Sequence, residues 1–312
     1  MPGLLAVFRK EMADNFASRR FLIMFALIML AGLSATYTAA QSIRSSVSES
    51  DPWGFVFLRL FTVSSGTLPS FVAFVGFLGP LVGLAMGFDA INGEYARGTL
   101  SRVLSNPIYR DSVINGKFLA GVATITTMLV AIALVLAGLG LRMIGIPPTP
   151  DEIYRLVFFL FIAVIYVAFW MSLAILFSIL FRQSATSALA GIAFWIFFTF
   201  FISMIAATLA QALFPINQQD PQTLVDNTNF AMAVARISPM TLYQETATTI
   251  LDPSTRAFGL VKLTELIGMV ASPLPLGQSL LVVWPQLVAL VSETLICFGI
   301  SYARFMRQEI RA

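Results

Sequence analysis

Long apolar runs alternate with short polar segments along the chain, and this pattern predicts the fold class. An α-helix needs about 20 apolar residues to cross a hydrocarbon layer of about 30 Å. Because backbone groups inside a bilayer must be hydrogen-bonded within the chain, runs of this length are helices. The sequence therefore predicts an all-α membrane protein whose six transmembrane helices cover residues 21–40, 68–89, 113–144, 154–181, 187–214 and 279–302.

Two further segments complete the predicted architecture. Residues 1–20 place Leu5, Phe8, Met12 and Phe16 at helical spacing, which favours an amphipathic helix lying along the inner leaflet over a soluble tail. Residues 215–278 form a long outer loop, in which prolines break two or three short helices. We expect these short helices to pack over the outer mouth or to dip into the outer leaflet.

Composition supports one membrane domain over residues 1–312. The chain is 58% hydrophobic and 11% charged, whereas soluble domains carry about 25% charged residues. Lys and Arg are scattered between the apolar spans, so the pI of about 9.2 indicates membrane-flanking charge and contact with lipid, and no nucleic acid. Histidine is absent and Cys297 is the single cysteine, which excludes Ser–His proteolysis, HExxH zinc sites and Cys-rich metal sites, so we expect no catalytic residues of these kinds and no metal site. The membrane domain leaves no stretch for a soluble catalytic domain, and we therefore expect that the chain is not an enzyme.

Charge also predicts the orientation. With the N-terminus inside, twelve of the nineteen Lys and Arg residues fall in cytoplasmic segments. Inner loops carry an excess of basic residues. We therefore expect a multi-pass protein of the cell membrane with both termini in the cytoplasm.

The inner segment 90–112, between the second and third spans, predicts a short cytoplasmic helix. Gly98 can end the preceding helix, Thr99 can cap a new one, and Pro107 ends it. Such a helix suits docking into a groove on a soluble partner, although a plain loop helix would have the same pattern. Its apolar face consists of Leu100, Val103 and Leu104, and Arg102 and Arg110 flank that face.

The sequence GEYARGTLSRVLSNPIYRDSVINGK, residues 93–117, resembles the signature of ABC-2 type permeases, the transmembrane subunits of bacterial and archaeal ABC exporters. That signature reads approximately G-E-x-x-x-G-T-L, then L-L-S-x-P-I-x-R and a later G-K. Val103 stands where leucine is common, and residues 305–311 also look like the C-terminus of that family. The matching positions are Gly93, Glu94, Gly98, Thr99, Leu100, Leu104, Ser105, Pro107, Ile108, Arg110, Gly116 and Lys117.

The resemblance implies a coupling helix near residues 99–105 that fits a cleft on a separate ATP-binding subunit. It also implies two copies of that subunit, with ATP and Mg bound there, and a dimer with a second permease copy or homologue. Glu94 would help to link the coupling helix to the spans; on charge alone, Glu94 and Asp89 are interpreted as surface pairs or caps. The chain itself contains no G-x-x-x-x-G-K-[ST] phosphate loop.

Two features inside the spans are candidates for function. Gly79, Gly83 and Gly87 allow a close helix contact, either beside a dimer axis or in ordinary bundle packing. Glu293 lies roughly 15 Å from the end of the last span, where a carboxylate is costly. It either lines a cavity on a possible substrate path or contacts a cationic substrate, or it bonds to a neighbouring side chain such as Ser172 or Gln183.

The leading hypothesis is a permease that moves substrate with ATP hydrolysed on another subunit. The alternative is a non-transporting membrane module that transmits ATP-driven motion to a partner, in maturation or signalling. A secondary transporter fits less well, because such proteins contain repeats and several buried ionisable groups.

Overall fold

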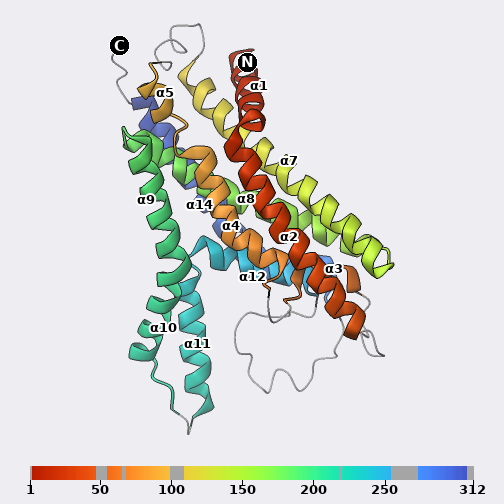
Figure 1. The fold of residues 1–312 in the computed structure, drawn as a ribbon. Coiled ribbons are helices and arrows are strands. Elements are labelled where there is room, and N and C mark those ends of the chain that lie inside the picture. Colours follow the sequence, from red (N-terminus) through yellow and green to blue (C-terminus); the bar gives the residue numbers. More distant parts are fainter. Residues whose placement is uncertain are drawn as a thin grey trace.

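The computed structural model describes residues 2–46, 55–64, 68–98, 109–217, 220–253 and 273–307, and nearly all of these residues are helical (Figure 1). The helices are α1 (Pro2–Ala17), α2 (Arg19–Ser46), α3 (Val56–Thr62), α4 (Phe71–Gly87), α5 (Asn92–Ala96), α7 (Arg110–Ile144), α8 (Pro150–Leu180), α9 (Ser184–Ile196), the π-helix η1 (Phe197–Phe201), α10 (Ile202–Leu213), α11 (Pro221–Ala235), α12 (Pro239–Leu251) and α14 (Leu276–Arg307).

Within the described residues, six helical stretches are long and apolar enough to cross a membrane. The fifth stretch joins α9, η1 and α10 end to end. The predicted all-α class and the number of spans are confirmed. The six stretches are Arg19–Ser45, Phe71–Ala96, Arg110–Ile144, Pro150–Leu180, Ser184–Leu213 and Leu276–Arg307.

Helix α8 is the centre of the bundle, and α4, α7, α12 and α14 pack against it. Its apolar sequence buries side chains on every face, including the fully buried Trp170 and Tyr166. Its start is fixed by a capping box, in which Thr149 and Glu152 each accept a hydrogen bond from the other residue's backbone N–H. A helix that is apolar all round belongs inside the bundle.

Helix α4 approaches α8 closely because its facing residues are glycines. A Cβ on Gly83 would lie 2.5 Å from the Val167 carbonyl oxygen, and one on Gly87 would lie 2.7 Å from that of Met171; Gly79 also faces Val167. The three glycines of the predicted small-residue motif therefore contact α8 of the same chain, which is packing inside the bundle.

A proline in α4 is compensated by a tyrosine of α8. Pro80 has no N–H, so the carbonyl of Gly76, four residues earlier, loses its helical donor. The Tyr166 hydroxyl donates to that carbonyl at 2.7 Å. A freed carbonyl at membrane depth is thus satisfied within the protein, as a lipid environment requires.

Helix α1 packs along α7. Val7 lies against Gly116, and the Asn15 amide donates to the Thr124 hydroxyl at 3.4 Å. Leu5, one of the residues of the predicted apolar face, is 47% exposed. The helix itself is present at Pro2–Ala17, and its placement along the inner leaflet remains a prediction.

The predicted outer loop contains α11 and α12. Helix α11 packs on α10 and buries none of its described residues, whereas α12 packs among α14, α8 and α4. Tyr243 of α12 stacks on Tyr166, with ring centroids 4.5 Å apart, and donates to the Val72 carbonyl at 3.2 Å. This helix is therefore an internal part of the bundle.

Candidate functional site

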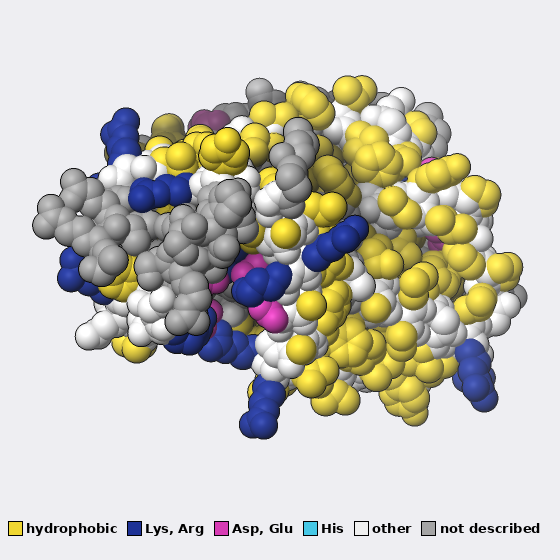
Figure 2. All heavy atoms as spheres, turned by 90° about the horizontal axis from the view of Figure 1, so that it is seen from above, with side chains coloured by type: hydrophobic (Ala, Val, Ile, Leu, Met, Phe, Trp, Pro, Cys, Tyr) yellow, Lys and Arg dark blue, Asp and Glu magenta, His cyan; other side chains and the backbone are white. Residues whose placement is uncertain are grey.

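The described elements that flank the predicted coupling segment in the sequence lie at one end of the bundle (Figure 1). Helix α1, helix α5, the start of α7 and the C-terminal end of α14 all lie at this end, which we call the terminal end (Figure 1). It is the end that the charge pattern predicts to be cytoplasmic. Seen from this end, Lys and Arg side chains lie around acidic ones (Figure 2).

Helix α5 is held on the C-terminal end of α8. The backbone N–H groups of Ile91 and Asn92 both donate to the Ser178 hydroxyl, at 2.9 and 3.1 Å, and the Asn92 amide donates to the Phe181 carbonyl at 3.2 Å. These bonds satisfy the start of α5, where N–H groups have no helical acceptor. The helix ends at Gly98, whose φ of +64° is the left-handed conformation that favours glycine.

The fixed position of α5 brings Glu94 against Lys117 of α7. The Lys117 ammonium lies 2.7 Å from the Glu94 carboxylate and 2.9 Å from the Glu11 carboxylate of α1. The side chains of Lys117, Glu94 and Glu11 are only 7%, 9% and 16% exposed. We call these three residues the Lys117 cluster. It joins three helices through charges that need one another to be buried.

The Lys117 cluster perturbs the acid of α1. Burial by itself raises the pKa of the Glu11 carboxyl, but the ammonium groups of Lys117 and Lys10 outweigh that effect and hold the pKa below its ordinary value of 4.5. Glu11 is therefore ionised at neutral pH, and its charge favours the contact with α7.

A cavity of about 170 Å³ adjoins the Lys117 cluster. Helices α1, α4, α5, α7 and α8 all contribute to its wall. A space of this size is large enough for several water molecules. All three residues of the Lys117 cluster therefore line a cavity with room for water. The charged side chains of the wall are Lys10, Glu11, Asp14, Asp89, Glu94, Arg97 and Lys117.

A second ion pair ties α2 to the end of α4 beside the cavity. The Arg20 guanidinium lies 2.7 Å from the Asp89 carboxylate and 4.8 Å from the centre of the Phe88 ring. The Arg20 side chain is 54% exposed, so this pair contributes little to stability.

Sequence reasoning placed part of this site and missed part of it. Asp89 forms a partly exposed pair, as expected, but the interpretation of Glu94 as a surface residue is wrong, because Glu94 is 7% exposed. The ion pair of Lys117 with Glu94, and that of Lys117 with Glu11, were not predicted. Arg110 begins α7. The residues Thr99, Leu100, Arg102, Val103, Leu104 and Pro107 of the predicted coupling helix lie outside the described residues.

Glu293 lies on α14, within the last span. Its Oε2 atom is buried and finds no hydrogen-bond donor among the described residues. The Ser172 hydroxyl, one of the two suggested partners, donates instead to the Phe169 carbonyl at 2.7 Å.

Comparison with known proteins identifies similar permeases. The chain is 31% identical over 119 residues to the "Probable ABC transporter permease protein NosY" of Pseudomonas aeruginosa, covering 38% of each chain. It is 29% identical over 144 residues to the protein of the same name from Stutzerimonas stutzeri, covering 44% of this chain and 48% of that one. The alignments thus span less than half of the length of these relatives.

The family comparison covers almost the whole chain. The profile described as "ABC-2 family transporter protein" matches residues 5–310, which include all six candidate spans and the Lys117 cluster. The resemblance seen in residues 93–117 therefore extends along the sequence. This chain belongs to the ABC-2 family of transporter proteins and is a multi-pass membrane protein of that family.

Proposed function

We propose that this chain is the permease subunit of an ABC transporter that moves substrate across the cell membrane. ATP and Mg bind to a separate ATP-binding subunit, present in two copies, and two permease chains form the path. Both termini face the cytoplasm. The family membership and the relatives named as permeases support this assignment. The observation that carries it is the buried Lys117 cluster, whose Glu94 and Lys117 lie on either side of residues 99–108 in the sequence.

Residues 99–108, which lie within the predicted coupling segment 90–112, connect α5 to α7 in the sequence, and these are two of the three helices that the Lys117 cluster joins. Glu94 of α5 lies before residues 99–108 and Lys117 of α7 lies after them. A push on this segment therefore reaches both partners of the 2.7 Å ion pair. Glu11 extends the connection to α1, which continues into the first span, α2, after a break at Ser18.

Each residue of the segment has a proposed role. The apolar face of the coupling helix docks in the cleft of the ATPase, because removing apolar surface from water favours association. Glu94 passes the motion to Lys117. Leu100, Val103 and Leu104 form the docking face; Gly98, Thr99 and Pro107 set the limits of the helix; Arg102 and Arg110 flank it with positive charge.

Co-purification tests the docking step. The tagged full chain, extracted from its native membrane, should carry a stoichiometric ATPase with Walker motifs. Changing Leu100, Val103 and Leu104 together to Asp should release the ATPase while the permease remains folded. Absence of any ATPase from the wild-type preparation, with transport driven by an ion gradient, would refute the assignment.

A second variant separates docking from coupling. Lys117→Met should keep the ATPase bound and should lower substrate-stimulated ATPase activity in proteoliposomes by tenfold or more, on the order of one lost buried ion pair. Lys10→Met is the matched control, since the Lys10 side chain is 58% exposed and its loss should change the rate less than twofold. Equal rates for the wild type and Lys117→Met would contradict the role of the Lys117 cluster. A fully coupled ATPase that moves no substrate would favour the mechanical-module alternative.

A further inference from the structure

Helix α14 carries two buried oxygen atoms that lack donors. Gln286 is 5% exposed; its Nε2 donates to the Glu245 carboxylate of α12 at 3.1 Å, whereas its Oε1 finds no donor among the described residues. The Oε2 atom of Glu293 is likewise buried without a donor in the described part of the chain. Both atoms are hydrogen-bond acceptors, so the partner that each one lacks is a hydrogen-bond donor.

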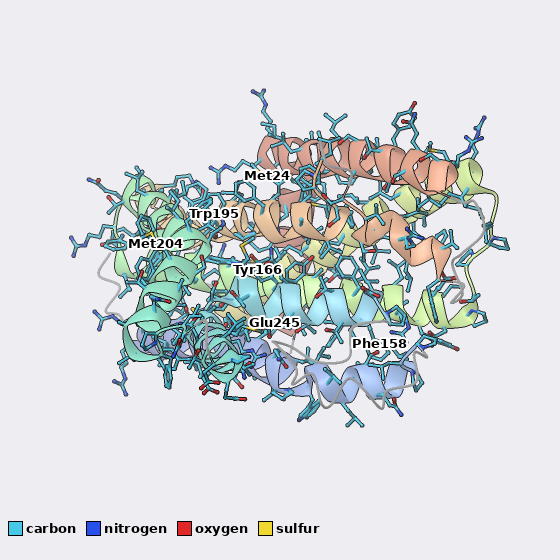
Figure 3. All side chains as sticks on the ribbon, turned by 90° about the horizontal axis from the view of Figure 1, so that it is seen from below. Met24, Phe158, Tyr166, Trp195, Met204 and Glu245 are labelled. Carbon is cyan, nitrogen blue, oxygen red and sulfur yellow. The ribbon has the colours of Figure 1, made fainter. Side chains whose placement is uncertain are left out.

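The two side chains share one side of α14. Seven residues separate them, which is two helical turns, about 10.5 Å along the axis and about 20° around it. Glu245 lies at the Gln286 end of this row, between α12 and α14 (Figure 3). We call Glu245, Gln286 and Glu293 the acceptor row.

The charge of the acceptor row is unbalanced. Arg236 binds both oxygens of Glu245, at 2.9 and 3.2 Å, so that carboxylate is already compensated. The ion pairs of the described residues do not include Glu293. Within the described residues, the row therefore combines two acceptor oxygens that have no donor with one carboxyl group that has no ion-pair partner.

The location restricts what can complete the acceptor row. Lipid tails supply neither hydrogen-bond donors nor positive charge, and unsatisfied polar groups at this depth cost several kcal/mol each. The opposite side of α14 is apolar and exposed, with Leu281 76% and Leu295 64% exposed, and therefore suits contact with hydrocarbon. A ligand that reaches the row from the bilayer would need an apolar chain and a head that donates N–H bonds.

We propose that the acceptor row binds the protonated amine head of a cationic amphiphile, whose apolar chain stays in the hydrocarbon region. The inference deepens the proposed transport function, because it assigns a substrate class to that permease. An ammonium group has three donors and one positive charge. It supplies the donors that the oxygens of Gln286 and Glu293 lack, and a charge opposite to that of the Glu293 carboxylate. Because the two residues are about 10.5 Å apart along α14, one head occupies one of these positions at a time, and the carboxylate of Glu293 is the stronger one.

Binding can be measured on the full-length permease alone, without ATP or the ATPase. Purified chain in nanodiscs is incubated with radiolabelled dodecylamine, and binding to empty nanodiscs is subtracted. Saturable binding is expected. Glu293→Gln should weaken it about tenfold, because the ammonium loses its charged partner, and Gln286→Met should weaken it by a smaller factor. Thr294→Val is the matched control, because that buried hydroxyl donates only to its own helix, at the Leu290 carbonyl, and should leave affinity within twofold.

Analogues of dodecylamine separate the contribution of the N–H donors from that of the positive charge. Dodecyltrimethylammonium carries the charge without N–H donors and should bind at least tenfold more weakly than dodecylamine; dodecanol has a donor without charge and should also bind weakly. Equal binding of the amine and the trimethylammonium would overturn the proposal, as would an absence of saturable binding. Unchanged affinity in both Glu293→Gln and Gln286→Met would overturn it as well.

Failure of this inference differs from failure of the proposed function. A permease that couples ATP hydrolysis to transport but binds no dodecylamine would retain its function and lose the acceptor row as a substrate site. A permease that binds dodecylamine through the acceptor row but recruits no ATPase would keep the site and lose the ABC assignment. Should Gln286→Met fail to fold, Glu293→Gln retains the size of the side chain and tests the same row.

Discussion

Two buried ionic clusters lie near opposite ends of the bundle, and their surroundings differ. The Lys117 cluster occupies the terminal end, next to the cavity. The Arg155 cluster, which consists of Arg155, Asp151 and Glu152, lies at the start of α8. Helix α8 runs between them through the core: it carries the Arg155 cluster at its start, and Ser178 near its other end holds the start of α5, the helix of Glu94.

The Arg155 cluster is bonded mainly to backbone. The fully buried Arg155 guanidinium donates to the carbonyls of Ile250 and Leu274 at 2.9 and 2.6 Å, and to the Asp151 carboxylate at 2.7 Å. Glu152 accepts from the backbone N–H of Phe57 at 3.0 Å. These bonds fix α8 to α3, to the end of α12 and to the chain before α14. A guanidinium with several backbone acceptors holds one geometry.

The Lys117 cluster is bonded side chain to side chain. One flexible ammonium is shared by two carboxylates, and the cavity beside it offers room for rearrangement. Lysine presents a compact charge on a flexible stem, so it can change partners where arginine would not. The difference indicates a bundle that is anchored at the Arg155 cluster and adjustable at the terminal end, where the proposed ATPase docks.

Removing the Arg155 guanidinium should have the largest effect on stability. Arg155→Met leaves the Ile250 and Leu274 carbonyls and the Asp151 carboxylate without their donor, so we expect a loss of about 3–5 kcal/mol in the free energy of unfolding. Thermal unfolding in detergent measures it. Arg142→Met, at an exposed position near the end of α7, is the control and should stay within about 0.5 kcal/mol. A change of similar small size for Arg155→Met would show that this end is not anchored.

The contact between α4 and α8 should be next in effect, because it links the two ends. Gly83→Ala places a methyl group 2.5 Å from the Val167 carbonyl oxygen and 2.8 Å from the Met171 backbone nitrogen, and overpacking of this kind costs about 2 kcal/mol. The same detergent unfolding assay applies. Gly138→Ala in α7 meets no atom within 4 Å and should cause no loss. Equal stability of the two variants would mean that α4 shifts freely on α8.

Local sequence pattern was sufficient for the spans and insufficient for the clusters. Apolar length is a property of consecutive residues, so all six spans follow from it. Pairing is not local: Lys117 and Glu11 are 106 positions apart, and only the packing of α1 on α7 brings them together. The local sequence therefore does not distinguish a charged residue that lies in a polar loop from one that lies in a buried cluster.

Helix α12 shows which part of the outer segment the sequence does not predict. Short helices are expected in residues 215–278, and α12 is one of them, but its threonines lower its hydropathy and give no sign that it packs inside the bundle. In the structure the Thr246 hydroxyl donates to the Leu242 carbonyl at 2.6 Å, inside its own helix. A hydroxyl satisfied in this way tolerates burial. A hydropathy scale still counts such a threonine as polar. The stacking of Tyr243 on Tyr166 is a contact between distant residues, so the spacing of residues along the sequence does not predict it.

Loss of the Lys117 ammonium should lower stability less than loss of the Arg155 guanidinium. Lys117→Met leaves two carboxylates near each other, but the adjacent cavity admits water, so we expect about 1 kcal/mol, the low end for a buried group that loses its partner. Hydrogen exchange of α1 amides should rise while exchange in α8 stays unchanged. A loss as large as that of Arg155→Met would show that the terminal end is as rigid as the other.

The smallest expected effect is a pH dependence carried by Glu11. Its pKa in the folded protein lies below the ordinary value of 4.5, because Lys117 and Lys10 together outweigh burial. An acid whose pKa is lowered by folding stabilises the fold at pH values above its ordinary pKa, and that contribution disappears as the pH falls through the pKa of the folded protein.

The wild type should therefore exceed Glu11→Gln in stability by about 0.5 kcal/mol at pH 7. We expect the difference to persist down to about pH 5 and to decline as pH falls below 4.5. Paired thermal unfolding curves from pH 7 to pH 4 measure it. A difference that grew toward acid would require Glu11 to be neutral in the fold, and the Lys117 cluster would then be held by Glu94 alone.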